Sequence, residues 1–162
     1  MTAPRIYFDY NATAPLLPAA LERMQAALRD YPGNPSSPHA FGQAARDALE
    51  TARSGIASRV GCTRRELTFT SGGSEANNTI FRAVAESGRP AHVITTPIEH
   101  PSVLRCCDWL QAQGVAVSYL PVNAAGLVDV DAVTALIRPE TRLVSVMAAN
   151  NETGVIQPME RL

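Results

Sequence analysis

Apolar residues recur along the chain with two different spacings. An apolar side chain returns every three or four residues in the segments expected to be helical, at about 18–28, 40–60, 75–87, 101–113 and 129–137. Short apolar runs predict strands at 67–70, 92–96, 115–120 and 143–147. Because strands and helices alternate and the strands are apolar, we expect an α/β fold with a mostly parallel sheet, covered by helices and joined by right-handed crossovers.

Proline, glycine and aspartate mark the expected ends of several elements. Pro18 opens the first helix, where its missing N–H costs nothing. Gly61 and Gly114 follow helical segments and are expected to end them, and Asp129 is expected to cap the last helix. Between the first two helices, three prolines within seven residues predict an irregular loop at 31–38.

A glycine turn, Ser71-Gly72-Gly73-Ser74, joins the expected strand at 67–70 to the next helix. Free backbone N–H groups and the positive end of a helix dipole converge at such a turn, which favours binding of a phosphate. A Gly-Gly turn is also a common connection in α/β domains, so both readings stay open. The spacings of a nucleotide P-loop and of the dinucleotide-binding glycine motif are absent.

Polar segments follow three of the expected strands, at 71–77, 99–100 and 150–154. In parallel sheets ligands bind beyond the carboxyl ends of the strands. We therefore expect these three segments to gather at one edge of the sheet and to form a site there.

Composition narrows the classes of function. The chain has 162 residues, 46% apolar and 18% charged, so a single globular domain with a sizeable core is expected. The net charge of −1 gives no reason to expect nucleic-acid binding. No signal peptide or membrane span is visible, and the three cysteines lack the spacing of a disulfide framework or a zinc site. The simplest expectation is a cytoplasmic protein without a bound metal.

Several polar residues could carry chemistry. His100 could stack on a flat ring or move a proton near neutral pH, or it could be a helix-start histidine bonded to backbone. The amide of Asn151 could bind a ligand oxygen or form an Asx-turn. Glu75 could cap a helix or orient a neighbour, and His39 and His92 are expected to be structural. All 14 basic residues are arginines, so the chain cannot complete a mechanism that needs a lysine amine.

Together these stretches resemble the N-terminal part of cysteine desulfurases, pyridoxal-phosphate enzymes of the class V aminotransferase family, and most closely the iron–sulfur-assembly type. The resemblance covers the whole chain, and its motifs occur in the family's order at 7–15, 33–37, 39–42, 69–78, 99–100 and 150–155. It implies the large domain of the fold type I transferases, with helices on both faces of the sheet. The expected division is an N-terminal segment at 1–15 and an incomplete cofactor-binding large domain at 16–162.

The resemblance also implies roles for individual residues. Gly73 and Ser74 are expected to hold the phosphate of pyridoxal 5′-phosphate. His100 is expected to stack on the pyridine ring and to shuttle protons as a catalytic residue. Asn151 is expected to bond the phenolic oxygen of the cofactor. Asn11 and Asn34 are expected to line the substrate mouth.

The implied activity converts L-cysteine to L-alanine and a protein-bound persulfide, for iron–sulfur clusters or tRNA thiolation. A homodimer with sulfur-acceptor or scaffold partners is implied, without direct contact to nucleic acid or membrane. The alternatives are a selenocysteine lyase, another class V enzyme, or a non-catalytic protein that docks to desulfurase subunits.

The chain departs from the family pattern. It lacks the Schiff-base lysine, the aspartate that pairs the pyridine nitrogen, the arginine for the substrate carboxylate and the sulfur-accepting cysteine loop. The chain alone is therefore expected to be inactive. Because strands that would complete the family's sheet are missing, it is also expected to be unstable in isolation or to need a second polypeptide.

Overall fold

The computed structural model describes residues 5–86 and 90–162. The chain divides into two compact units, Met1–Phe69 and Thr70–Leu162, and each is described by itself. In the described ranges no helix combines the length and the apolar character needed to cross a membrane. The predicted division at residue 15 stays a prediction.

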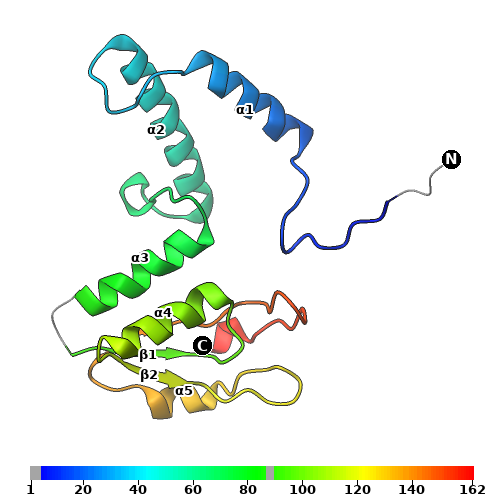
Figure 1. The fold of residues 1–162 in the computed structure, drawn as a ribbon, viewed down its shortest axis with the longest axis vertical. Coiled ribbons are helices and arrows are strands. Elements are labelled where there is room, and N and C mark those ends of the chain that lie inside the picture. Colours follow the sequence, from blue (N-terminus) through cyan, green and yellow to red (C-terminus); the bar gives the residue numbers. More distant parts are fainter. Residues whose placement is uncertain (1–4, 87–89) are drawn as a thin grey trace. The chain divides into compact units, whose positions relative to one another are not determined.

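The first unit is helical. It contains α1 (Pro18–Asp30), α2 (Ala40–Val60) and the short 3₁₀ helix η1 (Arg64–Glu66), and the first two confirm the predicted helices (Figure 1). Pro18 stands at the start of α1, and Gly61 ends α2 with a φ of 76°, in the left-handed region that glycine adopts without strain. His39 caps α2, where its Nδ1 accepts the Gly42 N–H at 3.3 Å, so its predicted structural role is confirmed.

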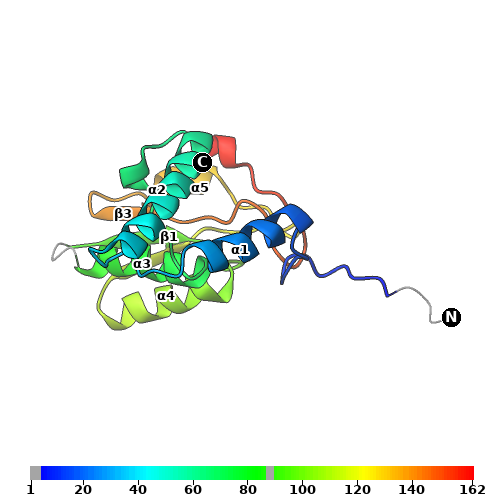
Figure 2. The same cartoon turned by 90° about the horizontal axis from the view of Figure 1, so that it is seen from above.

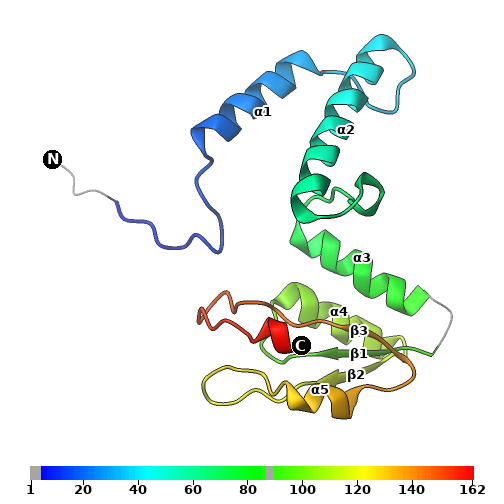
Figure 3. The same cartoon turned by 180° about the vertical axis from the view of Figure 1, so that it is seen from behind.

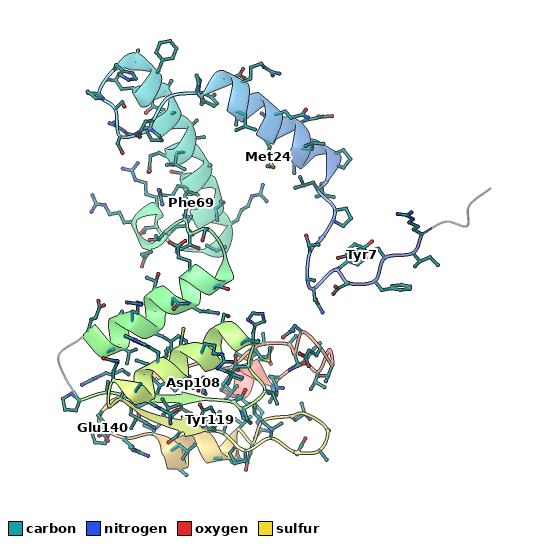
Figure 4. All side chains as sticks on the ribbon, viewed as in Figure 1. Tyr7, Met24, Phe69, Asp108, Tyr119 and Glu140 are labelled. Atoms are coloured by element: carbon teal, nitrogen blue, oxygen red, sulfur yellow. The ribbon has the colours of Figure 1, made fainter. Side chains whose placement is uncertain are left out.

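A polar contact holds one irregular segment of this unit, and the close fit of a glycine holds the other. The Tyr7 hydroxyl donates to the carbonyls of Asp9 and Thr13, at 2.7 and 3.1 Å, and thereby closes the N-terminal turn (Figure 4). In the proline loop, a Cβ on Gly33 would collide with the backbone of Phe41. Glycine at residue 33 therefore allows this loop to lie directly against the start of α2.

The predicted strand at 67–70 is wrong, because these residues form no strand. Among the described residues, no strand lies beside them to complete a ladder, and their backbone is held by a side chain instead. Arg53 of α2 donates to the Leu67 carbonyl at 2.6 Å, and its guanidinium lies 4.7 Å from the ring centroid of Phe69 (Figure 4). The apolar run is real, but a strand needs a partner for its backbone groups.

The second unit confirms the α/β fold. Its elements are, in order, α3 (Gly73–Glu86), β1 (His92–Thr95), α4 (Pro101–Ala112), β2 (Ala116–Tyr119), α5 (Asp131–Leu136), β3 (Thr141–Val144) and η2 (Met159–Arg161). The three strands form a parallel sheet in the order β2-β1-β3 (Figure 3). The end predicted for the first of these helices, at residue 87, lies outside the described residues.

Helices cover both faces of this sheet, as predicted. On one face Val93 packs with Phe81 of α3 and with Val103, Cys107 and Leu110 of α4. On the other face Ile94 packs with Leu120 and Val133, the latter from α5. Two views show α3 and α4 lying side by side on the first face (Figures 1 and 2). Two successive residues of one short strand therefore contribute to two separate cores, one on each face of the sheet.

The observed bounds differ from the predicted ones by one or two residues in most elements and by up to three residues in the last strand. The last helix begins at Asp131 rather than at residue 129, although the Asp129 carboxylate still accepts the Asp131 N–H at 3.1 Å. The last strand covers Thr141–Val144 rather than 143–147. After this strand the Ser145 N–H still donates to the Ile94 carbonyl of β1 at 2.8 Å, whereas the Met147 N–H donates to the carboxylate of Glu99 at 2.7 Å.

His92 joins all three strands. It is fully buried at the start of β1, and its ring nitrogens contact Thr141 Oγ1 of β3 and Ser118 Oγ of β2, both at 2.9 Å. This confirms the structural role predicted for His92. Burial lowers the pKa of its imidazole, and the positive charge of Arg138 lowers that pKa further. The folded state therefore favours the neutral ring.

The stability of this unit should depend on pH through His92. The ring titrates near pH 6.5 in the unfolded chain and at a lower pH in the folded chain, so stability is complete above about pH 6.5 and falls as the pH drops below it. The loss from one such group reaches at most about 1.4 kcal/mol per pH unit. Urea unfolding followed by the fluorescence of Trp109, the single tryptophan, measures it.

His92→Gln should flatten the part of this pH dependence that lies between pH 6.5 and 5, and His39→Gln, at an exposed cap, should leave it intact. Equal pH slopes for the wild-type chain and His92→Gln would contradict this role of the buried ring.

Candidate functional site

The start of α3 presents unpaired backbone donors. In the described part of the chain, the N–H groups of Gly73 and Ser74 have no hydrogen-bond partner. The Ser71 N–H is already taken, because Glu75 Oε2 accepts it at 2.7 Å, and this bonding lowers the pKa of the Glu75 carboxyl. A Cβ on Gly72 or Gly73 would meet no atom within 4 Å, so the space in front of the turn is open. The positive end of the helix faces this space.

His100 is the N-cap of α4, at the carboxyl end of β1. Its Nδ1 accepts the backbone N–H of Ser102 at 3.1 Å and lies 2.8 Å from Ser102 Oγ. Asn77 of α3 donates to the same Ser102 Oγ at 2.9 Å. The imidazole is solvent-exposed, although one of its nitrogens is bonded. The structure confirms the reading of His100 as a helix-start residue, whereas contact of its exposed edge with a ligand stays a prediction.

Glu99 connects the ends of β1 and β3. Its side chain is buried, and its Oε1 accepts the Thr96 hydroxyl at 3.0 Å and the Met147 N–H at 2.7 Å. Burial raises the pKa of this carboxyl, against the lowering effect of its two hydrogen bonds. Nearby, Asn150 Nδ2 donates to the Ile98 carbonyl at 3.0 Å. The segment after β3 is thus fastened to the segment that carries His100.

The turn at 150–154 is built around the Asn150 side chain. Asn150 Oδ1 accepts the N–H groups of Glu152 and Thr153, both at 2.9 Å. Gly154 closes the turn with a φ of 74°. This organisation leaves Asn151 exposed at the tip. Asn150 makes Asx-type bonds in this turn, and both readings of Asn151 stay predictions.

The structure therefore brings together the three polar segments that the sequence singled out. Asn77 and Ser102 link the first to the second, and Glu99 and Asn150 link the second to the third. Asn11 and Asn34 belong to the first unit. Asn34 closes a local turn there, in which its Oδ1 accepts the Ser36 N–H at 2.8 Å.

The sequence did not predict the role of three residues in this arrangement. Asn77 and Ser102 connect α3 to α4, and Glu99 connects the ends of two strands. Glu99 carried a usable signal, since it is an acidic residue four positions after the end of a fully buried strand. Asn77 and Ser102 carried none, because their pairing spans 25 positions.

Comparison with known families decides what kind of protein this is. The model of the aminotransferase class V family matches residues 6–162. The chain belongs to this family.

Cysteine desulfurases are among its similar relatives. A mitochondrial cysteine desulfurase of Arthroderma benhamiae is 46% identical over 97% of this chain and 32% of its own length. A human cysteine desulfurase is 45% identical over 97% of this chain and 35% of its own length. The cysteine desulfurase IscS of Dictyoglomus turgidum is 43% identical over 97% of this chain and 40% of its own length. The chain thus spans about a third to two fifths of the curated relatives it matches.

Solved structures give the same result. A NifS-like protein superposes with a TM-score of 0.92 at 42% identity, over 97% of this chain and 44% of that one. The structure of SspA in complex with cysteine superposes with a TM-score of 0.89 at 38% identity, over 96% of this chain and 45% of that one. These matches confirm the predicted resemblance to the N-terminal part of cysteine desulfurases and the fold type.

The residues of this class V chain fit an anionic, aromatic cofactor. Two unpaired N–H groups at a helix start suit a phosphate, and the open space beside the glycines admits one. The exposed imidazole of His100 suits contact with a flat ring. Among the described residues, no cluster of histidine, cysteine and acidic side chains has a geometry that could hold a metal ion.

The buried thiols of this chain are not nucleophiles. Cys106 and Cys107 lie on the buried face of α4, and burial raises the pKa of Cys107 to about 11. Cys106 donates to the Ser102 carbonyl at 3.0 Å, within its own helix. Cys62 is half-buried in the first unit.

Removing the Glu99 carboxyl should destabilise the second unit. Glu99→Ala leaves the Met147 N–H and the Thr96 hydroxyl without their acceptor, which should cost about 1–3 kcal/mol of unfolding free energy. Glu99→Gln keeps one acceptor oxygen and should cost less. Urea unfolding followed by Trp109 fluorescence measures both, with the exposed Glu86→Ala as control. The same midpoint for Glu99→Ala and Glu86→Ala would contradict this role.

Proposed function

We propose that this chain carries the part of a cysteine desulfurase that receives the phosphate and ring of pyridoxal 5′-phosphate. The observation that carries the proposal is the hydrogen-bonded connection between two polar elements. Asn77, in the second turn of α3, is bonded through Ser102 to the cap of α4, His100. The similarity to cysteine desulfurases over nearly the whole chain supports the same assignment.

Each site residue has a proposed task. The N–H groups of Gly73 and Ser74 bind the cofactor phosphate, assisted by the helix dipole. His100 stacks on the pyridine ring and moves protons. The amide of Asn151, at the tip of its turn, donates to the phenolic oxygen. Asn11 and Asn34 contribute to the substrate mouth.

The proposed reaction of the complete enzyme takes L-cysteine to L-alanine. A protein thiolate attacks the sulfur of the substrate, the carbon–sulfur bond breaks, and a proton replaces sulfur on the carbon. The sulfur leaves as a protein persulfide for iron–sulfur clusters or tRNA thiolation, through sulfur-acceptor or scaffold proteins and in a homodimer. When bound, the cofactor supplies an electron sink for the charge that develops beside the substrate amine.

We expect that the 162 residues do not carry out this reaction alone. Family chemistry holds the cofactor through a lysine amine, and every basic residue of this chain is an arginine. The proposal therefore assigns binding and orientation to this chain and the covalent attachment to a lysine of another polypeptide segment.

Substitutions at Gly73 test the phosphate site directly. Gly73→Asp should fold normally, because its Cβ meets open space and an acidic residue in the first turn suits the helix dipole. Its negative charge should weaken pyridoxal 5′-phosphate binding by at least about tenfold. Gly73→Asn, of equal size and without charge, should bind within about threefold of the wild-type chain. Isothermal titration calorimetry measures these affinities.

Pyridoxal without its phosphate provides the matched ligand control for the Gly73 series. It should bind more weakly than the phosphate ester and should not distinguish Gly73→Asp from Gly73→Asn. Equal affinity of the two variants for pyridoxal 5′-phosphate would refute the phosphate site.

The chain alone should not turn over L-cysteine. With pyridoxal 5′-phosphate and L-cysteine present, alanine should stay at the level of the cofactor without protein, because no lysine holds the cofactor in place. Amino-acid analysis of the reaction mixture measures alanine. Several equivalents of alanine per chain would show that a lysine is not needed.

A further inference from the structure

Three side chains form a directed hydrogen-bond chain between α3 and α4, two helices that pack against each other (Figure 1). Asn77 Nδ2 can only donate, so Ser102 Oγ accepts this bond at 2.9 Å. The hydroxyl hydrogen of Ser102 is then available for His100 Nδ1 at 2.8 Å. These two contacts allow the order Asn77 to Ser102 to His100, and the protonation of Nδ1 decides whether the second bond runs in this direction.

The backbone strengthens the same assignment. The Ser102 N–H also donates to His100 Nδ1, at 3.1 Å, and a ring nitrogen that accepts a hydrogen bond carries no proton. The hydrogen-bond network thus assigns the neutral imidazole with its proton on Nε2. In the described part of the chain Nε2 has no hydrogen-bond partner, so this edge is left to contact a ligand.

We propose that Ser102 and Asn77 are positioning residues for His100, which hold its ring in one orientation with the proton on Nε2. The Ser102 hydroxyl sets the ring, and Asn77 sets the direction of that hydroxyl. For a ligand at the start of α3 this arrangement delivers a donor edge whose orientation is fixed in advance. This last step rests on the proposed function, whereas the state of the ring does not.

Helix capping alone does not account for the arrangement. The backbone N–H of Ser102 already satisfies the cap, so α4 needs neither the hydroxyl nor Asn77. Asn77 comes from a different helix, 25 positions earlier in the chain. Half-buried Asn77 and Ser102 thus meet beneath an exposed ring. The contact therefore serves the ring rather than the helix end.

Nitrogen NMR of the imidazole in the full chain tests the proposal without any cofactor. Wild-type His100 should show Nδ1 as an unprotonated, hydrogen-bonded nitrogen and Nε2 as protonated. Ser102→Thr keeps the hydroxyl and should keep the Nδ1 signal. Ser102→Val has the shape of threonine without the hydroxyl and should move Nδ1 toward the position of a less strongly bonded nitrogen. Amide spectra check that both variants fold.

A substitution at Asn77 tests the direction of the chain. Asn77→Asp has nearly the same shape but can only accept, so it should draw the Ser102 hydroxyl away from the ring. Its Nδ1 signal, recorded at a pH where the ring is neutral, should shift in the same direction as that of Ser102→Val. Identical Nδ1 signals in the wild-type chain, Ser102→Val and Asn77→Asp would overturn the proposal, as would a protonated Nδ1 in the wild-type chain.

A second measurement connects the ring to its ligand. Ser102→Val should weaken the binding of pyridoxal 5′-phosphate by about threefold to tenfold, the effect of one lost hydrogen bond, and Ser102→Thr should restore it. Equal affinities of these two variants would overturn the positioning role. If the wild-type chain does not bind the cofactor, the proposed function fails, and the NMR comparison alone decides whether Ser102 and Asn77 set the ring.

Discussion

The second unit depends on one short strand that is buried on both faces. All four residues of β1 are buried, and both of its edges pair with parallel neighbours. Val93 and Ile94 point into opposite cores. The helices α3, α4 and α5 are therefore positioned by packing against this one strand. Because a parallel strand needs a crossover on each side, the segments that follow the strands come out at one edge. The polar site stands at that edge.

The carboxyl edge is held by side chains where the backbone ladder stops. Glu99 accepts the Met147 N–H, which strand pairing no longer satisfies, and Asn150 donates to the Ile98 carbonyl. A buried polar group that lacks a partner costs about 1–3 kcal/mol, so these bonds fix the relative position of two loops. His92 does the same at the opposite end of β1. The short sheet is thus clamped at both ends by polar side chains.

Local patterns predicted most of the elements. Helical spacing located α1, α2, α3 and α4 because their apolar faces repeat within the segment, and proline and glycine marked their ends. The run at 67–70 shows the limit of that reasoning. Its residues suit a strand, but a strand exists only where another chain segment offers a ladder, and Arg53 occupies the Leu67 carbonyl instead. Whether another segment pairs with these residues depends on the tertiary structure, and a four-residue sequence pattern does not reveal it.

The candidate site was predictable to the same degree. Its turns and His100 could be found because a polar segment after an apolar run is visible locally, whether or not that run forms a strand. The side chains that orient these groups could not be found from the sequence, because their contacts join distant positions. Asn77 and Ser102 are 25 positions apart, and Glu99 and Met147 are 48 positions apart.

Recognition of a cofactor and its covalent attachment need different groups. Non-covalent recognition needs donors at a helix start, an aromatic contact and an amide, and turns fixed by their own hydrogen bonds can present these groups. Covalent attachment needs one amine at one place. The turns at 71–74 and 150–154 are closed by Glu75 and Asn150, which belong to the same segments as the donors they hold. The hydrogen bonds that close these two turns are local, whereas the orientation of the His100 ring depends on a contact between Asn77 and Ser102 that spans 25 positions.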